Sequence, residues 1–417
     1  MQCVLAVDGG NTKTIAIVAA LDGTILGAGR GGCGDIYNAR PDATPPFIVG
    51  APLAGALGLA GAPGVGGALD DHHARPGADS PSMVGAPLAG ALGGVGALGA
   101  AGALGAADAL GVAGALPTAA LHDSSATAIA NIEYAVISAL QAAHVNTSDL
   151  LAGVFNMAGA DWPEDFALLQ AAMEARNFGR TIIVQNDALG VLHAGSSDNT
   201  GVSVVCGTGA GTGARGPDGR TWHSSRWQDQ AQGSTMLAHK TLDALYRSEL
   251  GIEPPTTLTP RVLDFFHLNT VEEVLHLFTG RMQRPPTHIG LLTPILLDEA
   301  HAGDSVARQI VEEHGDMLGK YALAAARHVG IEGTAFTLVL AGGVLRHPSS
   351  LLADAIIRRV QTISPEVRPT RYRFEPIIGV LFTALEAANV AIDDALLGNL
   401  ISTFPAPALF ATSHNPL

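Results

Sequence analysis

The chain has 417 residues, which is long enough for two packed domains, and only 15% of them are charged. The formal net charge of −15 opposes general binding to nucleic acid or to anionic membranes, because both carry negative charge themselves. The three cysteines (Cys3, Cys33 and Cys206) match no zinc or iron–sulfur spacing, so we expect small buried side chains. No secretory signal pattern opens the chain, and we expect a cytoplasmic protein.

A β-meander is predicted at the start of the chain. The apolar runs 3–8 and 13–20 predict two strands joined by a turn at Gly9-Gly10-Asn11. A second turn, at Leu21-Asp22-Gly23, leads into a third strand expected over 24–29.

The meander is followed by a segment of low complexity. Residues 41–121 consist mainly of Gly, Ala, Pro and Leu, and one ten-residue string occurs twice, at 49–58 and 84–93. No helical or strand period runs through the segment, and its frequent glycines raise the entropy cost of ordering it. We interpret it as an insertion into the fold.

Strands and helices alternate in the rest of the chain, with a helix-rich stretch in the middle. In order, the pattern predicts a helix over 125–143, strand 151–156, helix 164–177, strand 181–185, a helix from 188, strand 201–206, helices 234–250, 259–267, 271–278, 289–302 and 304–329, strand 335–340, helix 348–361, strand 370–374 and helix 378–390. This order predicts an α/β fold of two domains, 1–185 and 186–375, with a cleft between them. Residues 393–417 are interpreted as a loosely attached tail.

The first candidate site is the hairpin Asp8-Gly9-Gly10-Asn11-Thr12-Lys13-Thr14. Its glycines let a ligand approach the backbone, and the N–H groups of such a turn can donate to phosphate oxygens. Lys13 adds a positive charge, and Asp8 is a candidate to hold Mg²⁺ through water. An ordinary hairpin with a polar turn is the alternative.

The second candidate is the run Gly207-Thr208-Gly209-Ala210-Gly211-Thr212-Gly213, directly after the predicted strand 201–206. A dinucleotide fingerprint would open a helix, whereas a turn over 214–219 follows this run. We therefore expect a strand–loop–strand hairpin that holds phosphate, with a flexible turn as the alternative.

Two further segments follow predicted strands. Gly342-Gly343 ends the strand 335–340 and would let adenosine lie close to the backbone, although the same turn also serves packing. Asp187 follows the strand 181–185, where it could accept the proton of an attacking hydroxyl. Capping the next helix is the rival role for Asp187.

The order of these segments (hairpin, Asn-Asp-Ala, Gly-Thr-Gly, Ala-Gly-Gly) resembles the actin/hexokinase/Hsp70 ATPase superfamily. Within it, the chain is similar to the BadF/BadG/BcrA/BcrD-type ATPase family, which includes N-acetylglucosamine kinase. The resemblance covers residues 1–40 and roughly 124–392. It implies two actin-like (ribonuclease H-like) domains with an ATP cleft between them, a helix over 376–392 that returns to the first domain, and a homodimer.

The resemblance also implies an ATP-dependent sugar kinase that uses Mg²⁺, with a role for each candidate residue. The implied roles are Mg²⁺ binding for Asp8; phosphate binding for Gly9, Gly10, Asn11, Thr12, Lys13, Gly207, Thr208 and Gly209; adenosine binding for Gly342 and Gly343; catalysis for Asp187; and sugar binding for Asp35, Asn38, Asn186, Asp187, Trp227, Gln228, Asp229 and Gln232.

The chain departs from the amino-sugar kinase pattern in two places. The family's Gly-Asp-Glu-Gly-Ser places its acidic pair on Ala231 and Gln232, and a frequent family Asn falls on Gly211. Losing a hydrogen-bonding partner can change discrimination between substrates by on the order of 10⁴-fold. The altered stretch therefore leaves the acceptor open. The resemblance makes N-acetylglucosamine or glucosamine the first candidate, and a plain surface loop is the alternative for 221–233.

Two other functions fit parts of the sequence. The altered acceptor loop is compatible with a sensor that binds sugar or nucleotide without catalysis. An ATPase that activates a radical dehydratase needs cysteines in the second domain to hold a cluster between subunits, and Cys206 is the only cysteine there.

Overall fold

The computed structural model describes residues 1–40, 118–196, 198–228, 232–280, 289–371 and 375–411, with the side chains of the first helix from Ser124 onward. The predicted insertion lies outside these residues except for 118–121. Those residues belong to helix α1 (Thr118–Ala143), which begins at 118 and not at 125 as expected.

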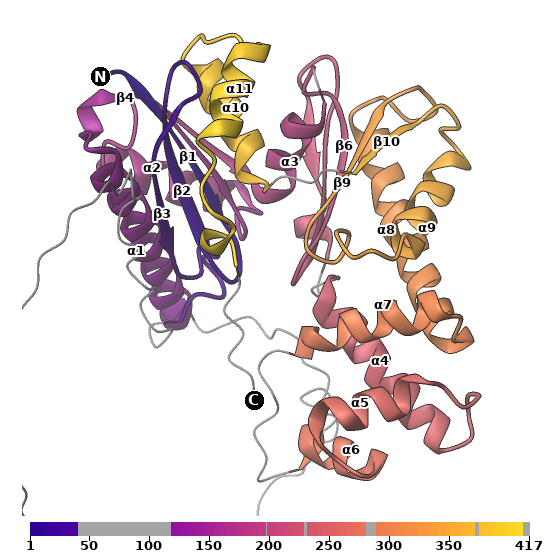
Figure 1. Ribbon diagram of the computed structural model, residues 1–417. Helices are drawn as coiled ribbons and strands as arrows, with labels where there is room; N and C mark the ends of the chain where they lie inside the picture. Colours follow the sequence, from indigo (N-terminus) through magenta and orange to yellow (C-terminus); the bar gives the residue numbers. More distant parts are fainter. Residues whose placement is uncertain (41–117, 197, 229–231, 281–288, 372–374, 412–417) are drawn as a thin grey trace, which may run out of the picture. The chain divides into compact units, whose positions relative to one another are not determined.

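The first sheet contains five strands in the order β3-β2-β1-β4-β5 (Figure 1). They are β1 (Cys3–Gly9), β2 (Thr14–Ala20), β3 (Ile25–Gly31), β4 (Leu150–Met157) and β5 (Thr181–Asn186). The first three strands pair antiparallel, which confirms the predicted meander, and β4 and β5 run parallel to β1.

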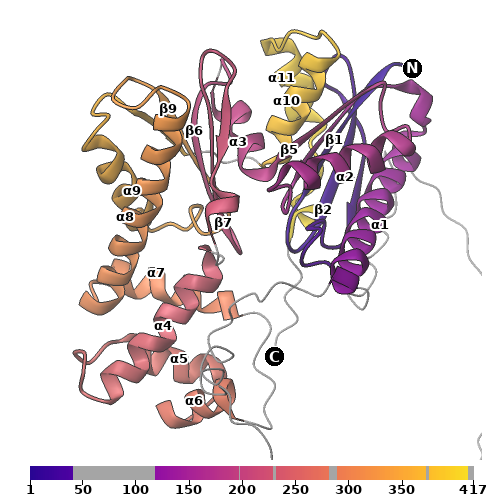
Figure 2. The same ribbon diagram turned by 180° about the vertical axis from the view of Figure 1, so that it is seen from behind.

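Both faces of this sheet are covered by helices (Figures 1 and 2). Helices α1 and α2 (Pro163–Ala175) pack on one face, and α10 (Ile377–Ala387) with α11 (Asp394–Ser402) packs on the other. Alternate residues of a strand point to opposite faces, so Leu5 and Val7 enter the first core, whereas Val4 and Ala6 enter the second. The same alternation places Asp8 on the α10 face, at the end of β1.

The second sheet has the order β10-β9-β6-β7-β8. Its strands are β6 (Gly201–Cys206), β7 (Ala210–Arg215), β8 (Thr221–His223), β9 (Thr337–Ala341) and β10 (Arg368–Arg371). Helices α8 (Ser305–His328) and α9 (Leu351–Gln361) pack on one face, and α3 (Asp187–Gly195) packs on the other through Val191 and Leu192.

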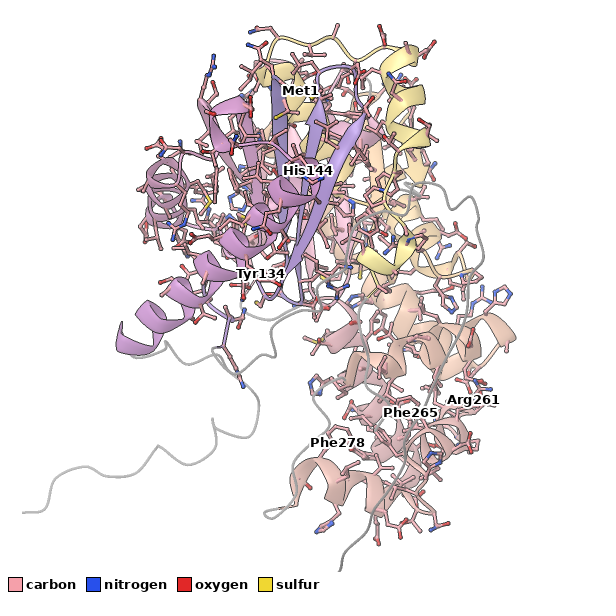
Figure 3. The ribbon with its side chains drawn as sticks, turned by 60° about the vertical axis from the view of Figure 1, so that its left-hand side comes forward. Met1, Tyr134, His144, Arg261, Phe265 and Phe278 are labelled. Atoms are coloured by element: carbon pink, nitrogen blue, oxygen red, sulfur yellow. The ribbon has the colours of Figure 1, made fainter. Side chains whose placement is uncertain are left out.

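A helical group, made of α4 (Ser234–Glu249), α5 (Leu258–Phe266), α6 (Val271–Thr279) and α7 (Leu292–Ala302), lies between β8 and α8 in the chain. Thr270 caps α6, and Asp304 accepts from the N–H of Ala307 at the start of α8. Edge-to-face contacts run from Phe265 through Phe266 to Phe278 and join α5 to α6 (Figure 3).

Helices α3 and α10 cross at two glycines. A Cβ on Gly379 would lie 1.7 Å from the carbonyl oxygen of Gly190, so only glycine permits this approach. Beside the crossing, His193 of α3 pairs with Thr383 (3.0 Å) and Glu386 (3.0 Å) of α10. The helix that begins with Asp187 is therefore fixed against the helix that covers the first sheet.

The interpretation of 393–417 as a loosely attached tail is wrong for the described residues 393–411. These residues form helix α11 and a following turn, and Leu396, Leu400 and Phe410 are buried against the first sheet. The local sequence does not indicate this packing, because the partners of these side chains lie on strands near the other end of the chain. No helix within the described ranges is long and apolar enough to cross a bilayer.

Candidate functional site

The Asp8–Thr14 hairpin is closed by its own backbone and braced from two sides. The N–H of Gly10 donates to the carbonyl of Lys13 (2.9 Å), and the N–H of Gly34 donates to the carbonyl of Gly10 (3.0 Å). A Cβ on Gly9 would lie 2.2 Å from the methyl carbon of Met157, so a larger residue there would require the Met157 side chain to move. Asn11 and Thr12 at the tip are exposed, as a ligand-binding turn requires.

The run that begins at Gly207 forms the predicted strand–loop–strand hairpin. Strands β6 and β7 pair antiparallel, and the N–H of Gly207 donates to the carbonyl of Gly209 (2.8 Å) across the loop. The first N–H of helix α4, on Ser234, donates back to the carbonyl of Gly207 (2.8 Å). A Cβ built on Gly209 would lie 3.9 Å from the Asn11 amide nitrogen, so this loop faces the first hairpin.

Gly342 and Gly343 have different roles in the turn after β9. Gly342 has a φ of 101°, and a Cβ there would lie 2.3 Å from the carbonyl oxygen of Cys206. Gly343 is exposed, and nothing lies within 4 Å of the position of its Cβ. Gly342 thus shapes the turn, while Gly343 leaves open space beside it for a flat ligand.

Asp187 is the first residue of helix α3, and it is not the cap. Asn186 takes that role by accepting from the N–H of Ala188 (3.1 Å). Its amide nitrogen donates to the Ala160 carbonyl (3.1 Å), to Asp161 (3.1 Å) and to Ser225 (3.0 Å). The rival role predicted for Asp187 therefore belongs to its neighbour, and the carboxylate of Asp187 remains available for chemistry.

Four carboxylates gather around the end of the first sheet. Burial raises the pKa of Asp187 to about 7, and the charges of Asp8, Asp161 and Asp35 add to the shift. Burial also raises the pKa of Asp161 to about 6, again with help from the Asp35 charge. A carboxylate whose pKa lies near neutrality is suited to accept a proton.

Asp8 shares this environment. Burial raises its pKa to about 6, the charge of Lys13 opposes the shift, and that of Glu375 adds to it. No group of three or more His, Cys, Asp or Glu side chains with the geometry of a metal site occurs in the part of the chain that the structure describes. Magnesium is commonly held by one or two carboxylates together with substrate phosphates, so Asp8 beside the Gly9–Lys13 turn fits Mg²⁺ that arrives with a nucleotide.

Asp35 and Asn38 form a hydrogen-bonded unit after β3. Asp35 is 5% exposed and accepts from the Asn38 side chain (2.8 Å) and from the N–H of Tyr37 (2.8 Å). The hydroxyl of Tyr37 donates to the buried Asp165 (2.8 Å), which also accepts from the N–H of Trp162 (2.8 Å). Asp165 is not among the residues predicted from the sequence, where its only signal is a polar residue just inside the predicted helix 164–177.

Asp161 was also missed, although it follows a predicted strand as Asp187 does. It lies within hydrogen-bonding distance of Asn186 and next to the charges of Asp35 and Arg226. The Arg226 guanidinium lies 5.6 Å from the ring centroid of the exposed Trp162. Aromatic side chains combined with a few placed polar groups are typical of small-molecule sites.

The predicted acceptor loop is in part structural. Trp227 is 64% exposed, and the Gln228 amide donates to Ser224 (3.2 Å). The carbonyl of Gln232 accepts from the ring Nε2 of the buried His314 (2.8 Å), which anchors the loop to α8. Asp229 lies outside the described residues.

Lys13 does not point at open solvent. Its ammonium donates to the carbonyl of Phe410, and Arg30 donates to the carbonyls of Leu409 (2.9 Å) and Ala411 (2.5 Å). Burial lowers the pKa of Lys13. The C-terminal segment thus holds the lysine predicted to bind phosphate, and a phosphate role requires the ammonium to leave the Phe410 carbonyl.

Residues 5–384 match the BadF/BadG/BcrA/BcrD ATPase family. The chain belongs to this family. It is 25% identical over 231 residues to an N-acetylmuramic acid/N-acetylglucosamine kinase of Clostridium acetobutylicum, covering 54% of this chain and 74% of the relative. It is 22% identical over 239 residues to an N-acetyl-D-glucosamine kinase of Dictyostelium discoideum, covering 55% and 74%.

Solved structures agree with this BadF/BadG/BcrA/BcrD ATPase assignment at the level of fold. The fold matches a putative N-acetylglucosamine kinase of Chromobacterium violaceum with a TM-score of 0.54 at 17% identity, covering 92% of this chain and 98% of the other. A putative N-acetylglucosamine kinase of Porphyromonas gingivalis gives a TM-score of 0.54 at 14% identity, covering 93% and 100%. The two sheets are therefore those of the actin-like fold that the sequence predicts.

Proposed function

We propose that this protein is an ATP-dependent sugar kinase that transfers the γ-phosphoryl group to a hydroxyl of an amino sugar or hexose. N-acetylglucosamine and glucosamine are the first candidates for the acceptor. The proposal rests on one observation above the others: Asn186 caps helix α3, so that the Asp187 carboxylate is not used as the cap and lies near Asp8. Burial, with the charge of Asp8, raises the pKa of Asp187 to about 7. Family membership and the named relatives support it.

In this proposal Asp187 accepts the proton of the attacking sugar hydroxyl. The N–H groups of the Gly9–Lys13 turn and the Gly207–Gly209 loop hold the phosphates, and Gly342 and Gly343 border the adenosine. Mg²⁺, when bound with ATP near Asp8, neutralises charge on the phosphate oxygens. These groups act by positioning and charge stabilisation, because phosphoryl transfer needs little covalent help from a protein.

The acceptor side of the proposed site contains Asp35, Asn38 and Asp161, with Asn186 holding Asp161 in place. Trp227, Gln228, Asp229 and Gln232 are proposed to border the sugar, with Gln232 positioned by its backbone bond to His314. The family's acidic pair is absent from this loop, which leaves the choice of sugar to Asp35, Asn38 and Asp161. The carboxylates of Asp35 and Asp161 favour acceptors that donate hydrogen bonds.

The proposal also includes the domain arrangement, the location and the oligomeric state. The residues 1–185 and 186–375 are proposed as two lobes that enclose ATP, in a cytoplasmic homodimer. Light scattering of the purified protein measures the oligomeric state, and a mass of one chain would remove the dimer from the proposal.

The decisive experiment is a coupled ADP-release assay over hexoses, hexosamines and N-acetylhexosamines, with wild type and Asp187→Asn compared at equal concentration. One sugar should accelerate ATP turnover, and the variant should lose that acceleration. Tight sugar binding by calorimetry without any transfer would favour the sensor alternative, which the altered acceptor loop keeps open.

A further inference from the structure

One buried polar side chain beside the proposed site has no partner. Asn156 of β4 is 1% exposed, and neither its amide nitrogen nor its amide oxygen makes a hydrogen bond. Buried amides are nearly always paired, because an unmet donor or acceptor loses its bonds to water and gains nothing in return. A side chain retained under this penalty indicates a partner that arrives with a ligand.

The strand register places Asn156 next to Asp8. The two residues are direct neighbours across the parallel pair β1–β4, and Asn156 is in turn opposite Gln185 of β5. Strand alternation puts Asn156 on the same face as Val154, which belongs to the core that also contains Val4 and Ala6. Adjacent strands lie about 4.8 Å apart, so the Asn156 amide and the Asp8 carboxylate share one face at one level.

Helix α3 has a glycine at the position that faces the Asn156 amide. A Cβ on Gly190, in the interior of α3, would lie 2.0 Å from the Asn156 amide nitrogen. Glycine is unfavourable inside a helix, so this position is kept against its local cost. The amide therefore lies between the strand that ends with Asp8 and the helix that begins with Asp187.

We propose that Asn156 is a positioning residue that orients the Asp8 carboxylate for the cation that accompanies the nucleotide. This structure contains no Asn156–Asp8 hydrogen bond. When the cation binds, the Asn156 Nδ2 would donate to one Asp8 oxygen, and the other Asp8 oxygen and the Asn156 Oδ1 would accept from the water shell of the cation. Magnesium keeps much of its water shell, and an acceptor beside the carboxylate holds one of those waters. The inference rests on the proposed function for its nucleotide but not for its sugar.

The test uses Asn156→Leu, which keeps the number and branching of the side-chain heavy atoms and removes both unmet polar atoms, and Val154→Ala as a control two residues away on the same face. Calorimetry measures binding of Mn²⁺·ADP, and of ADP in EDTA, to the full chain without sugar. Asn156→Leu should bind Mn²⁺·ADP at least tenfold more weakly, bind ADP in EDTA as wild type does, and unfold at the same or a higher temperature. Val154→Ala should unfold earlier and bind Mn²⁺·ADP normally.

Equal affinities of Asn156→Leu and wild type for Mn²⁺·ADP would overturn the proposal. A loss of affinity for ADP in EDTA as large as the loss for Mn²⁺·ADP would also overturn it, because the effect would then not depend on the cation. Asn156→Ala replaces the leucine variant if that variant does not fold, with the same expected result. The sugar assay is separate: wild type that binds Mn²⁺·ADP but phosphorylates no sugar would remove the proposed function and leave the role of Asn156 standing.

Discussion

Replacing Asp187 with asparagine should stop phosphoryl transfer and, at the same time, stabilise the protein near pH 8. The carboxylate has a pKa of about 7 in the folded chain, mainly because of burial, against a usual value of 3.8. Between these two values the folded state binds more protons than the unfolded state, so stability is lost as the pH rises through this window. Asparagine does not ionise, so the variant should not lose this stability as the pH rises.

The magnitude follows from the shift. A difference of about 3 pKa units at 1.36 kcal/mol each gives an upper limit of about 4 kcal/mol at pH 8. Asp187 is only partly buried by surface area, and the charges of Asp8 and Asp161 that contribute to its shift themselves titrate, so about 2 kcal/mol is expected. Near pH 4 the variant and wild type should have equal stability.

The assay compares thermal unfolding of both proteins from pH 4 to pH 8, together with turnover of ATP in the presence of sugar. Turnover should fall by at least about 100-fold, the low end for loss of a general base. Asp304→Asn is the control of opposite sign, because bonds from Ala307, Thr257 and Thr256 outweigh burial and lower the pKa of Asp304. That control should destabilise by nearly the same amount from pH 8 to about pH 5, because the stabilisation from a lowered pKa is lost only as the pH falls below the usual value of 3.8. A pH-independent difference between Asp187→Asn and wild type would refute the assignment.

Three further outcomes are expected. Gly342→Ala should lower the unfolding temperature, because its Cβ would lie 2.3 Å from a backbone oxygen and the φ of Gly342 is 101°. Gly343→Val should keep the unfolding temperature, because nothing lies within 4 Å of its Cβ, and it should raise the KM for ATP. Asn186→Ala should cost about 1 kcal/mol for the lost cap and also lower kcat, measured by denaturant unfolding and the coupled assay; unchanged kcat would contradict its role beside the base. Deleting 404–417 should lower the unfolding temperature, because Leu409 and Phe410 are buried in the first domain. The same deletion should lower the KM for ATP, because Lys13 loses its hydrogen bond to the Phe410 carbonyl and is free to bind phosphate. An unchanged or higher KM would contradict a phosphate role for Lys13.

Much of the candidate site was accessible from local patterns. The hairpin at Gly9 and Gly10, the loop after Cys206 and the carboxylate after β5 all follow apolar runs that end in glycine or polar residues. Each depends on strand ends and turns, whose chemistry is set by a few consecutive residues. These are the features that an isolated sequence encodes best.

Other parts of the site depend on residues distant in sequence. Asn156 and Asp161 stand in or after a strand like any other polar residue, and only the register with Asp8 and the bond from Asn186 distinguish them. A buried polar residue in a strand is invisible until the neighbouring strand is known, because its partner is chosen across the sheet and not along the chain.

The sequence by itself determined most of the order of strands and helices, though not β8 or α11, together with the two glycine-rich loops, the family and the position of Asp187. Tertiary structure decided that Asn186 is the cap, that residues 393–411 are packed, and that Lys13 meets a carbonyl 397 residues away. The physical reason is range: turn and strand preferences act between near neighbours, whereas burial, pKa shifts and the partners of long side chains depend on segments that only folding brings together.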